Sequence, residues 1–410
     1  MELWGEIALD DWGKVGHRSK AGIYYWHSKK RDLIDEDTCY STVIFSGNKS
    51  EGRCPTTIAS RYEALYLFIK DKPQVLGTRC AAMHNNHLPF QVKIRSLRKA
   101  MPLACHPSKE HAERLHRLDP ERYRCDEHKP KLIVAKLSLE MLAGFRPKEE
   151  IFSFLSDIPE LAIVVPYVTI QDYLYSGKIM HLKRMLYFLM SATHQEMKLS
   201  LDIFFERMNK ADDSQRSAVL FNVLRTLHDQ YPYDCGVYAP LFFNRFTMAP
   251  GTAIFLPSGT VHSYLLGDCL EISTRSENIV RVGLTDLYKN VDEFLEIADF
   301  TSTNPESFAY RPTVLDKYVL SFTPPTTEFG VFRICVPAED DYAIKERESC
   351  SMLLVTRGSA MLEDSTIIKL GTTLFLLPYH TIKFKVRKDI TIYLVYPNPD
   401  APHGEFGNLF

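Results

Sequence analysis

The fold is decided by Ala100-Met101-Pro102-Leu103-Ala104-Cys105-His106-Pro107, a stretch that predicts a short β-strand with a histidine at its end. Alternate side chains of a strand share a face, so Pro102, Ala104 and His106 are expected to point into one interior. Cys105 is expected to point the opposite way. Proline removes a hydrogen-bond donor from the strand ladder. The stretch therefore predicts an interrupted strand that presents His106 to the inside of a sheet or barrel.

Length and composition are those of a globular protein with a substantial core. The chain has 410 residues, of which 45% are hydrophobic and 24% charged, and this length is enough for two or three domains. Lys and Arg (49) nearly balance Asp and Glu (51), which gives no reason to expect nucleic acid as a partner. The longest apolar run, residues 161–170, contains Pro166 and is too short to span a bilayer. We therefore expect no nucleic-acid partner and no membrane partner.

The N-terminus and the cysteines indicate the compartment. The first residues include acidic side chains and lack the long apolar region of a signal peptide. The nine cysteines include no C-x-x-C pair, which is typical of scattered reduced thiols. The sequence therefore predicts a cytoplasmic protein.

The hydrophobic pattern changes twice along the chain. From Lys148 to Gln230 the apolar residues follow helical spacing, whereas short β-branched and aromatic runs precede and follow this block. Strand-like runs about ten residues apart between Lys317 and Tyr396 suggest a sandwich or jelly-roll barrel. Residues 370–378 weakly resemble residues 249–257 in sequence, as is expected if the chain forms two barrels of one architecture. We therefore expect a mainly β protein with a helical insertion.

Three local elements are also predicted near the decisive stretch. Residues from Pro55 to Lys70 place apolar side chains mostly at helical spacing, which predicts a helix. The run from Leu88 to Ile94 reads as a strand. Residues from Lys109 to Arg117 are good helix formers and follow Ser108, a plausible helix cap.

A set of short motifs occurs in one order along most of the chain. They are Trp12-Gly13-Lys14, Leu88-Pro89-Phe90 with Lys93, Cys105-His106-Pro107-Ser108-Lys109, His128-Lys129-Pro130, Gly144-Phe145-Arg146-Pro147, Tyr231-Pro232-Tyr233-Asp234-Cys235-Gly236, Ala239-Pro240-Leu241-Phe242-Phe243-Asn244, His262-Ser263-Tyr264 and Ser276-Glu277-Asn278-Ile279-Val280-Arg281. Each motif is weak by itself, but their order and spacing together resemble the type I mannose-6-phosphate isomerases.

The resemblance implies two cupin-type jelly-roll barrels plus an α-helical domain. The first part of the catalytic cupin barrel would comprise residues 1–147, and the helical insertion residues 148–230. The remainder of that barrel would comprise residues 231–315, and a C-terminal cupin-like barrel residues 316–410.

The resemblance also implies a zinc site, and this chain departs from it at two positions. The family has a Gln-x-His pair on the decisive strand, a Glu after His-Lys-Pro, and a His in a later segment. His106 and His262 match the two histidines and are the metal ligands that the resemblance implies. The Gln position is Ala104 and the Glu position is Lys131. An ammonium group supplies neither the negative charge nor the oxygen of a carboxylate ligand.

Four further residues match functional positions of the family. Arg281 and Lys129 are implied as catalytic, and Lys93 and Glu271 as substrate-binding. Ordinary alternatives are a structural salt bridge for Arg281, a solvated lysine for Lys129, and buried core imidazoles for the two histidines, His106 and His262. Glu271 could replace a lost metal ligand, but the family has Glu there too, which favours its family role.

The implied activity is the zinc-assisted interconversion of mannose 6-phosphate and fructose 6-phosphate in mannose metabolism and GDP-mannose biosynthesis. Because two of four ligand positions are replaced, we expect weak or no activity and little stoichiometric zinc. The small-molecule partner would be a sugar phosphate. Two alternatives stay open: a catalytically inactive homologue that binds a sugar phosphate or a protein, and a pair of barrels that serves only as an interaction scaffold.

Overall fold

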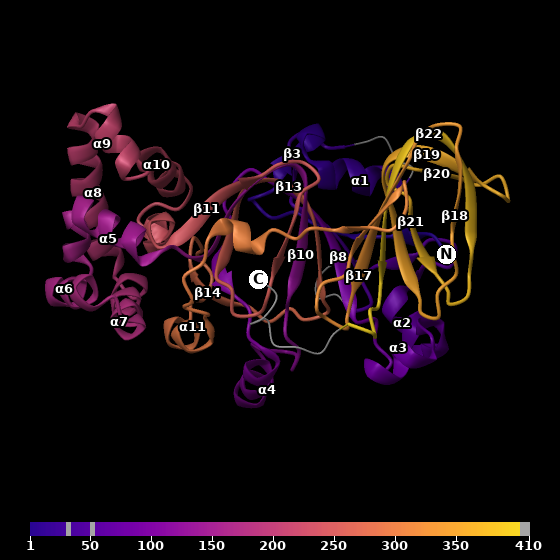
Figure 1. Cartoon of the computed structure of the whole chain (residues 1–410), viewed down its shortest axis with the longest axis horizontal. Helices are drawn as coiled ribbons and strands as arrows, with labels where there is room; N and C mark the ends of the chain where they lie inside the picture. Colours follow the sequence, from indigo (N-terminus) through magenta and orange to yellow (C-terminus); the bar gives the residue numbers. More distant parts are fainter. Residues whose placement is uncertain (30–33, 50–53, 402–410) are drawn as a thin grey trace.

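The computed structural model describes residues 1–29, 34–49 and 54–401. The molecule is elongated, with a helical block at one end, a first sheet in the middle and a second sheet at the other end (Figure 1). Its class is mainly β with a helical insertion, which confirms the expected class. The recorded strand pairings follow open paths in both sheets, so neither closes into a ring of strands within the described residues.

Within the described residues, the first sheet is antiparallel and has nine strands. Six follow the order β11 (Phe243–Met248), β10 (Lys131–Phe145), β13 (His262–Thr274), β8 (Phe90–Leu97), β5 (Thr42–Ser46) and β2 (Glu6–Ala8), and the other three are β12 (Ala253–Leu256), β9 (Leu103–Cys105) and β14 (Val280–Gly283). The long strands β10 and β13 pair along most of their lengths, with bulges. The decisive stretch forms β9, which is only three residues long and pairs with β13 and β14.

In the part of the chain that the structure describes, the second sheet has eight strands, all from the C-terminal region. Its path is β15 (Thr313–Val314), β16 (Val319–Phe322), β17 (Gly330–Val336), β22 (Ile382–Tyr396), β19 (Ser351–Leu362) and β20 (Ile367–Lys369), with β18 (Asp341–Ile344) and β21 (Thr373–Leu376) beside it. The strand-rich pattern predicted from Lys317 to Tyr396 is therefore present. The last nine residues of the predicted C-terminal barrel, 402–410, lie outside the described residues.

The block from Lys148 to Gln230 is helical. It holds α5 (Lys148–Asp157), α6 (Tyr167–Ser176), α7 (Ile179–Met190), α8 (His194–Lys210), α9 (Asp213–Ala218) and α10 (Phe221–Gln230). A capping box between Thr193 and Glu196 begins α8. The predicted apolar stripe of α7 is buried, from Leu182 to Met190. The domain boundaries drawn from the sequence stay a prediction, although this block coincides with the change in pattern.

The remaining helices correct one expectation. They are α1 (Lys20–Ser28), α2 (Leu65–Asp71), α3 (Thr78–Met83), α4 (Lys109–Leu118) and α11 (Val291–Ile297). Helix α4 begins at the Ser108 cap, as predicted. The helix predicted from Pro55 to Lys70 is wrong in its first half, where β6 (Thr57–Ile58) and β7 (Glu63–Ala64) pair as a hairpin. Strand β6 also pairs with β1 (Leu3–Trp4), and this tertiary pairing overrides local helical spacing.

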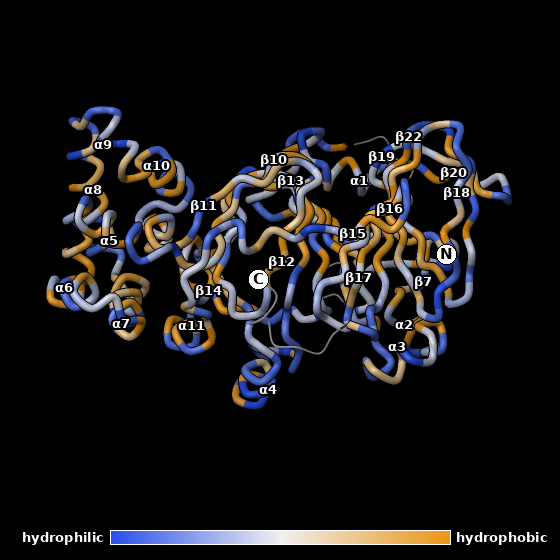
Figure 2. The backbone as a smooth tube through the Cα atoms, in the orientation of Figure 1, coloured by the Kyte–Doolittle hydropathy of each residue, from blue (hydrophilic) through white to orange (hydrophobic). Residues whose placement is uncertain are grey.

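One hydrophobic cluster joins the two sheets. It contains buried residues of the first sheet, such as Val92 and Leu270, and of the second, such as Met352 and Val395. The apolar strands facing each other between the sheets are visible in Figure 2. A second large cluster holds the helical block against β9 and β14. Within the described residues, no helix is long and apolar enough to cross a membrane.

Candidate active site

Strand pairing brings the expected site residues together inside the first sheet. Ala104 on β9 lies opposite His262 on β13 and opposite Arg281 on β14. Lys93 on β8 lies opposite Glu271 on β13. Lys131 is the first residue of β10, next to the same part of β13. Residues separated by more than 130 positions are thus neighbours because β8, β9 and β10 all pair with β13.

The two histidines face each other as neutral imidazoles. Their ring centroids are 5.3 Å apart, and both side chains are buried. Burial and the nearby Lys131 lower the pKa of His262 to about 3. Burial, Lys131 and Lys129 hold the pKa of His106 well below its usual range. Neutral, buried histidines can offer lone pairs to a donor or a metal ion.

The backbone determines which nitrogen of each ring carries the proton. His262 Nδ1 lies 2.9 Å from the carbonyl oxygen of Thr260, and His106 Nδ1 lies 2.6 Å from that of Asn278. A carbonyl oxygen only accepts, so each Nδ1 must donate. Each Nε2 therefore carries a lone pair. His106 Nε2 is buried and has no hydrogen-bond partner among the described residues.

Lys131 fills the space beside His262. Its Nζ lies 3.1 Å from His262 Nε2 and 3.7 Å from Glu271 Oε2, and the residue is 5% exposed. Since His262 Nε2 can only accept, Lys131 donates this hydrogen bond. Burial lowers the pKa of Lys131 to about 7, although the Glu271 carboxylate opposes that shift.

Both carboxylate oxygens of Glu271 accept hydrogen bonds from neighbouring side chains. Arg95 binds both of its oxygens, with Nε 3.0 Å from Oε2 and Nη2 3.1 Å from Oε1. The Tyr264 hydroxyl also donates to Oε2. Burial would raise the pKa of Glu271, but Arg95, Lys131 and Lys93 hold it well below its usual range. With 0% exposure, Glu271 holds its neighbours in place and presents no surface to a ligand.

A second charged cluster lies beside the first. The Nζ atoms of Lys93 and Lys129 are each 3.1 Å from a carboxylate oxygen of Glu277. Both lysines are buried, whereas the Glu277 side chain is 63% exposed. Partial desolvation would raise the pKa of Glu277, but the amino groups of Lys129 and Lys93 hold it well below its usual range. Burial lowers the pKa of Lys93 to about 8, opposed by Glu277.

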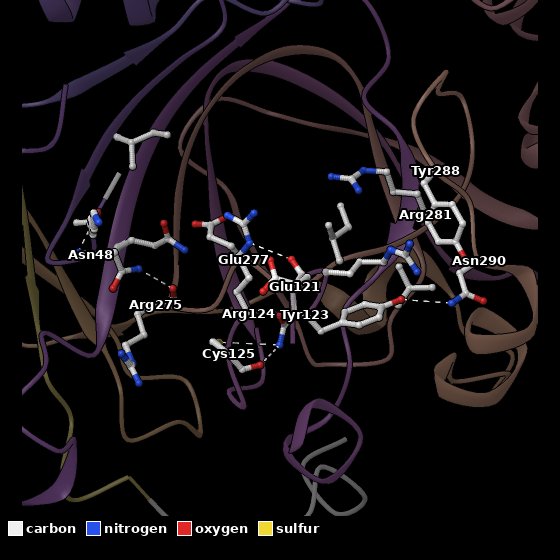
Figure 3. Close-up of a pocket in the computed structure, with 18 of the residues that line it drawn as sticks. Asn48, Glu121, Tyr123, Arg124, Cys125, Arg275, Glu277, Arg281, Tyr288 and Asn290 are labelled. Atoms are coloured by element: carbon white, nitrogen blue, oxygen red, sulfur yellow. Dashed lines mark hydrogen bonds between the residues drawn. The ribbon is translucent and has the colours of Figure 1, made fainter. Parts of the chain in front are cut away.

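A cavity of about 650 Å³ opens above this cluster, and Glu277 projects into it. Figure 3 shows Arg281, Tyr288 and Asn290 at one end, Arg275 and Asn48 at the other, and Glu277 between them. The basic lining residues are Lys49, Arg122, Arg124, Arg275 and Arg281, and the acidic ones are Glu6, Glu121 and Glu277. Arg281 Nε has no hydrogen-bond partner among the described residues. This positive excess suits an anionic ligand.

The residues present do not fit a zinc ion. A zinc centre takes about four N, S or O ligands. Within the described ranges, no group of three or more His, Cys, Asp or Glu side chains could hold a metal ion. Ala104 has no ligating atom, Lys131 donates to the His262 lone pair, and Glu271 is occupied by Arg95. The degraded zinc site stays a prediction.

Sequence reasoning identified the histidines and Lys131 but missed Arg95 and Glu277. A weak signal for Arg95 exists in β8, where Gln91, Lys93 and Arg95 alternate with apolar residues and therefore share one face. Glu277 lies within a motif that also contains Arg281, and no spacing rule distinguishes it from a surface acid. The pairing of each with its partner depends on strand register.

The fold and site define a class: β-rich proteins with a helical block and a cation-rich cavity beside a cluster of buried charges. Residues 2–148 match the family described as phosphomannose isomerase type I, catalytic domain. The mannose-6-phosphate isomerase of Mus musculus is 30% identical over 401 residues, covering 93% of this chain and 95% of the mouse protein. A probable mannose-6-phosphate isomerase of Caenorhabditis elegans is 29% identical and covers 95% of this chain and 94% of its own length.

Solved structures share the fold. The apo form of mannose 6-phosphate isomerase from Salmonella typhimurium superposes with a TM-score of 0.82 at 20% identity, over 97% of this chain and 98% of the other. A mannose 6-phosphate isomerase bound with zinc and yttrium gives the same TM-score and identity, over 97% of this chain and 99% of the other. The chain belongs to the mannose-6-phosphate isomerase family.

Proposed function

We propose that this chain binds mannose 6-phosphate and fructose 6-phosphate in the cavity above Glu277 and interconverts them slowly, without stoichiometric zinc. The observation that carries the proposal is the ionised, exposed Glu277 held by Lys93 and Lys129 in a cation-rich cavity. Family membership supports the choice of substrate, since the relatives are named for mannose 6-phosphate.

The cavity has groups for both ends of a sugar phosphate. A phosphate dianion gains charge-assisted hydrogen bonds from arginine, and the Arg281 side chain lines one end of the cavity. Glu277 lies between the two ends, where it could reach the sugar carbons (Figure 3). Glu271 takes no part in ligand contact in this proposal, because Arg95 and Lys131 surround it.

The reaction moves a proton between adjacent carbons and passes through an enediol, so it needs a proton carrier and a positive charge near the developing oxyanion. We assign the proton transfer to the Glu277 carboxylate and the positive charge to Lys129 and Arg281. Lys93 fixes the position of Glu277. Because its pKa is held well below the usual range, Glu277 is a weak base, which supports slow turnover.

The test combines a binding assay with a coupled assay of fructose 6-phosphate formation. Thermal shift with mannose 6-phosphate should raise the melting temperature, since a ligand that binds only the folded state stabilises it. Glu277→Gln should abolish turnover, and Arg281→Met should weaken binding. Arg245→Met is the matched control, because Arg245 pairs with Glu140 outside the cavity.

The outcomes separate the hypotheses. Binding with slow turnover that Glu277→Gln removes would support the proposal. Binding without turnover would favour the inactive, ligand-binding homologue. No stabilisation and no turnover would refute the proposal and leave the scaffold hypothesis. We also propose a cytoplasmic location, which the nine free cysteine thiols support.

A further inference from the structure

We infer that the positively charged Lys131 amino group takes the place of a metal ion in this site. The chain then binds its anionic ligand without a metal ion. The inference rests on the proposed function, because Lys131 lies two residues from Lys129, whose amino group holds the Glu277 carboxylate of the cavity. It goes further because it assigns a role to Lys131, the residue at the lost ligand position.

The first support is the occupied lone pair. His262 Nδ1 donates to the Thr260 carbonyl, so Nε2 is the atom free to bind a metal ion. Lys131 Nζ lies 3.1 Å from that atom and donates to it. A metal ion and this amino group cannot use the same lone pair. The histidine is oriented as a ligand would be, and its partner is a side chain.

The second support is charge. In the family pattern a divalent ion accompanies a carboxylate at position 131, and the two together carry a single positive charge. The ammonium form of Lys131 carries the same charge at the same place. Replacement of Gln by Ala104 changes no charge. The two substitutions together therefore remove the metal ligands and, when Lys131 is protonated, conserve the net charge of the site.

The third support is the way in which Lys131 is held. Glu271 Oε2 lies 3.7 Å from Lys131 Nζ, and Arg95 and Tyr264 fix that carboxylate from the other sides. Lys131 Nζ also lies 5.6 Å from the centroid of the Tyr264 ring. A buried carboxylate with three partners is a fixed anchor for a cation. This arrangement leaves Glu271 no oxygen with which to complete a metal shell.

The first experiment uses metal ions alone. The wild-type chain should hold no stoichiometric zinc after dialysis against zinc and desalting, and cobalt should produce no tetrahedral absorption bands. The double variant Ala104→Gln with Lys131→Glu restores an amide and a carboxylate to the two histidines. It should bind one zinc per chain and show the cobalt bands. A wild-type chain with one tightly bound zinc would overturn the inference, whether or not it binds a sugar phosphate.

The second experiment measures binding of mannose 6-phosphate with and without EDTA. The wild-type affinity should not change with the chelator. Lys131→Met, which removes the charge and keeps much of the side-chain volume, should weaken binding roughly tenfold, and added zinc should not restore it. Lys136→Met is the control, since Lys136 is a lysine of the same strand that contacts Thr356 instead.

Each outcome has a definite meaning. Affinity that EDTA lowers, or that Lys131→Met leaves unchanged, would overturn the inference. If the wild-type chain binds no mannose 6-phosphate under any condition, the proposed function fails and the metal titration decides the inference. If Lys131→Met does not fold, the wild-type zinc, cobalt and EDTA measurements still decide it.

Discussion

Replacement of Arg95 by methionine should destabilise the protein by about 3 kcal/mol. The change keeps much of the apolar stem and removes the guanidinium that binds both oxygens of Glu271, at 3.0 and 3.1 Å. Opposite charges at 3 Å attract by about 5 kcal/mol at an effective dielectric constant of 20. Removing one partner of a buried pair typically costs about 3–5 kcal/mol. Lys131 and Tyr264 still contact Glu271, which favours the lower end of that range.

The assay is urea unfolding at pH 7, followed by tryptophan fluorescence. All three tryptophans lie within the first 26 residues, so the signal reports the N-terminal part of the chain. The controls are Glu271→Gln and the double variant with Arg95→Met. Because the two side chains act as a pair, the double variant should lose at least about 1 kcal/mol less than the sum of the single variants. Additive losses, or an Arg95→Met loss below about 1 kcal/mol, would refute the reasoning.

The dependence of stability on acid pH provides a second test of the Arg95→Met variant. The pKa of Glu271 is held well below the usual 4.5 in the folded protein, so its stabilising contribution is present above pH 4.5 and is lost as the pH falls below it. Without Arg95 the folded-state pKa should rise towards the unfolded value. The free energy of unfolding of Arg95→Met should therefore decrease less than that of wild type between pH 4.5 and 3.

Other changes test other parts of the structure. Burial lowers the pKa of Lys136 from 10.5 to about 8, so the unfolded chain binds more protons than the folded one between these pH values, and stability should rise with pH there. Between pH 7 and pH 10, urea unfolding of Lys136→Met should show a smaller rise than that of wild type, since Lys93 and Lys131 still contribute to it. Thr193→Ala removes the capping box of α8 and should cost about 1 kcal/mol of stability by the same measurement, with Thr226→Ala within α10 as the surface control. Leu186→Ala, at a fully buried position of α7, should cost about 2–5 kcal/mol and lower the melting temperature followed by circular dichroism; no change would contradict the packing of the helical block.

Local pattern was informative wherever a segment's structure depends on its own residues. The helical block shows this, because the apolar stripe of α7 has helical spacing and is buried in that register. Helix α4 shows it too, since Ser108 caps the helix that follows. The local pattern gave a wrong prediction between Pro55 and Lys70, because β6 pairs with β1 at the start of the chain. Strand partners distant in sequence are not encoded in local spacing.

The sequence by itself determined the family, the mainly β class with its helical block, and the positions of His106, His262 and Lys131, because ordered motifs and periodicity are properties of the chain. Only the tertiary structure decided what those residues touch. The placement of Lys131 on His262, and of Arg95 on Glu271, follows from the register of β8 and β10 on β13. A shift of one residue would turn each side chain to the opposite face, so these contacts exist only once the whole sheet has formed.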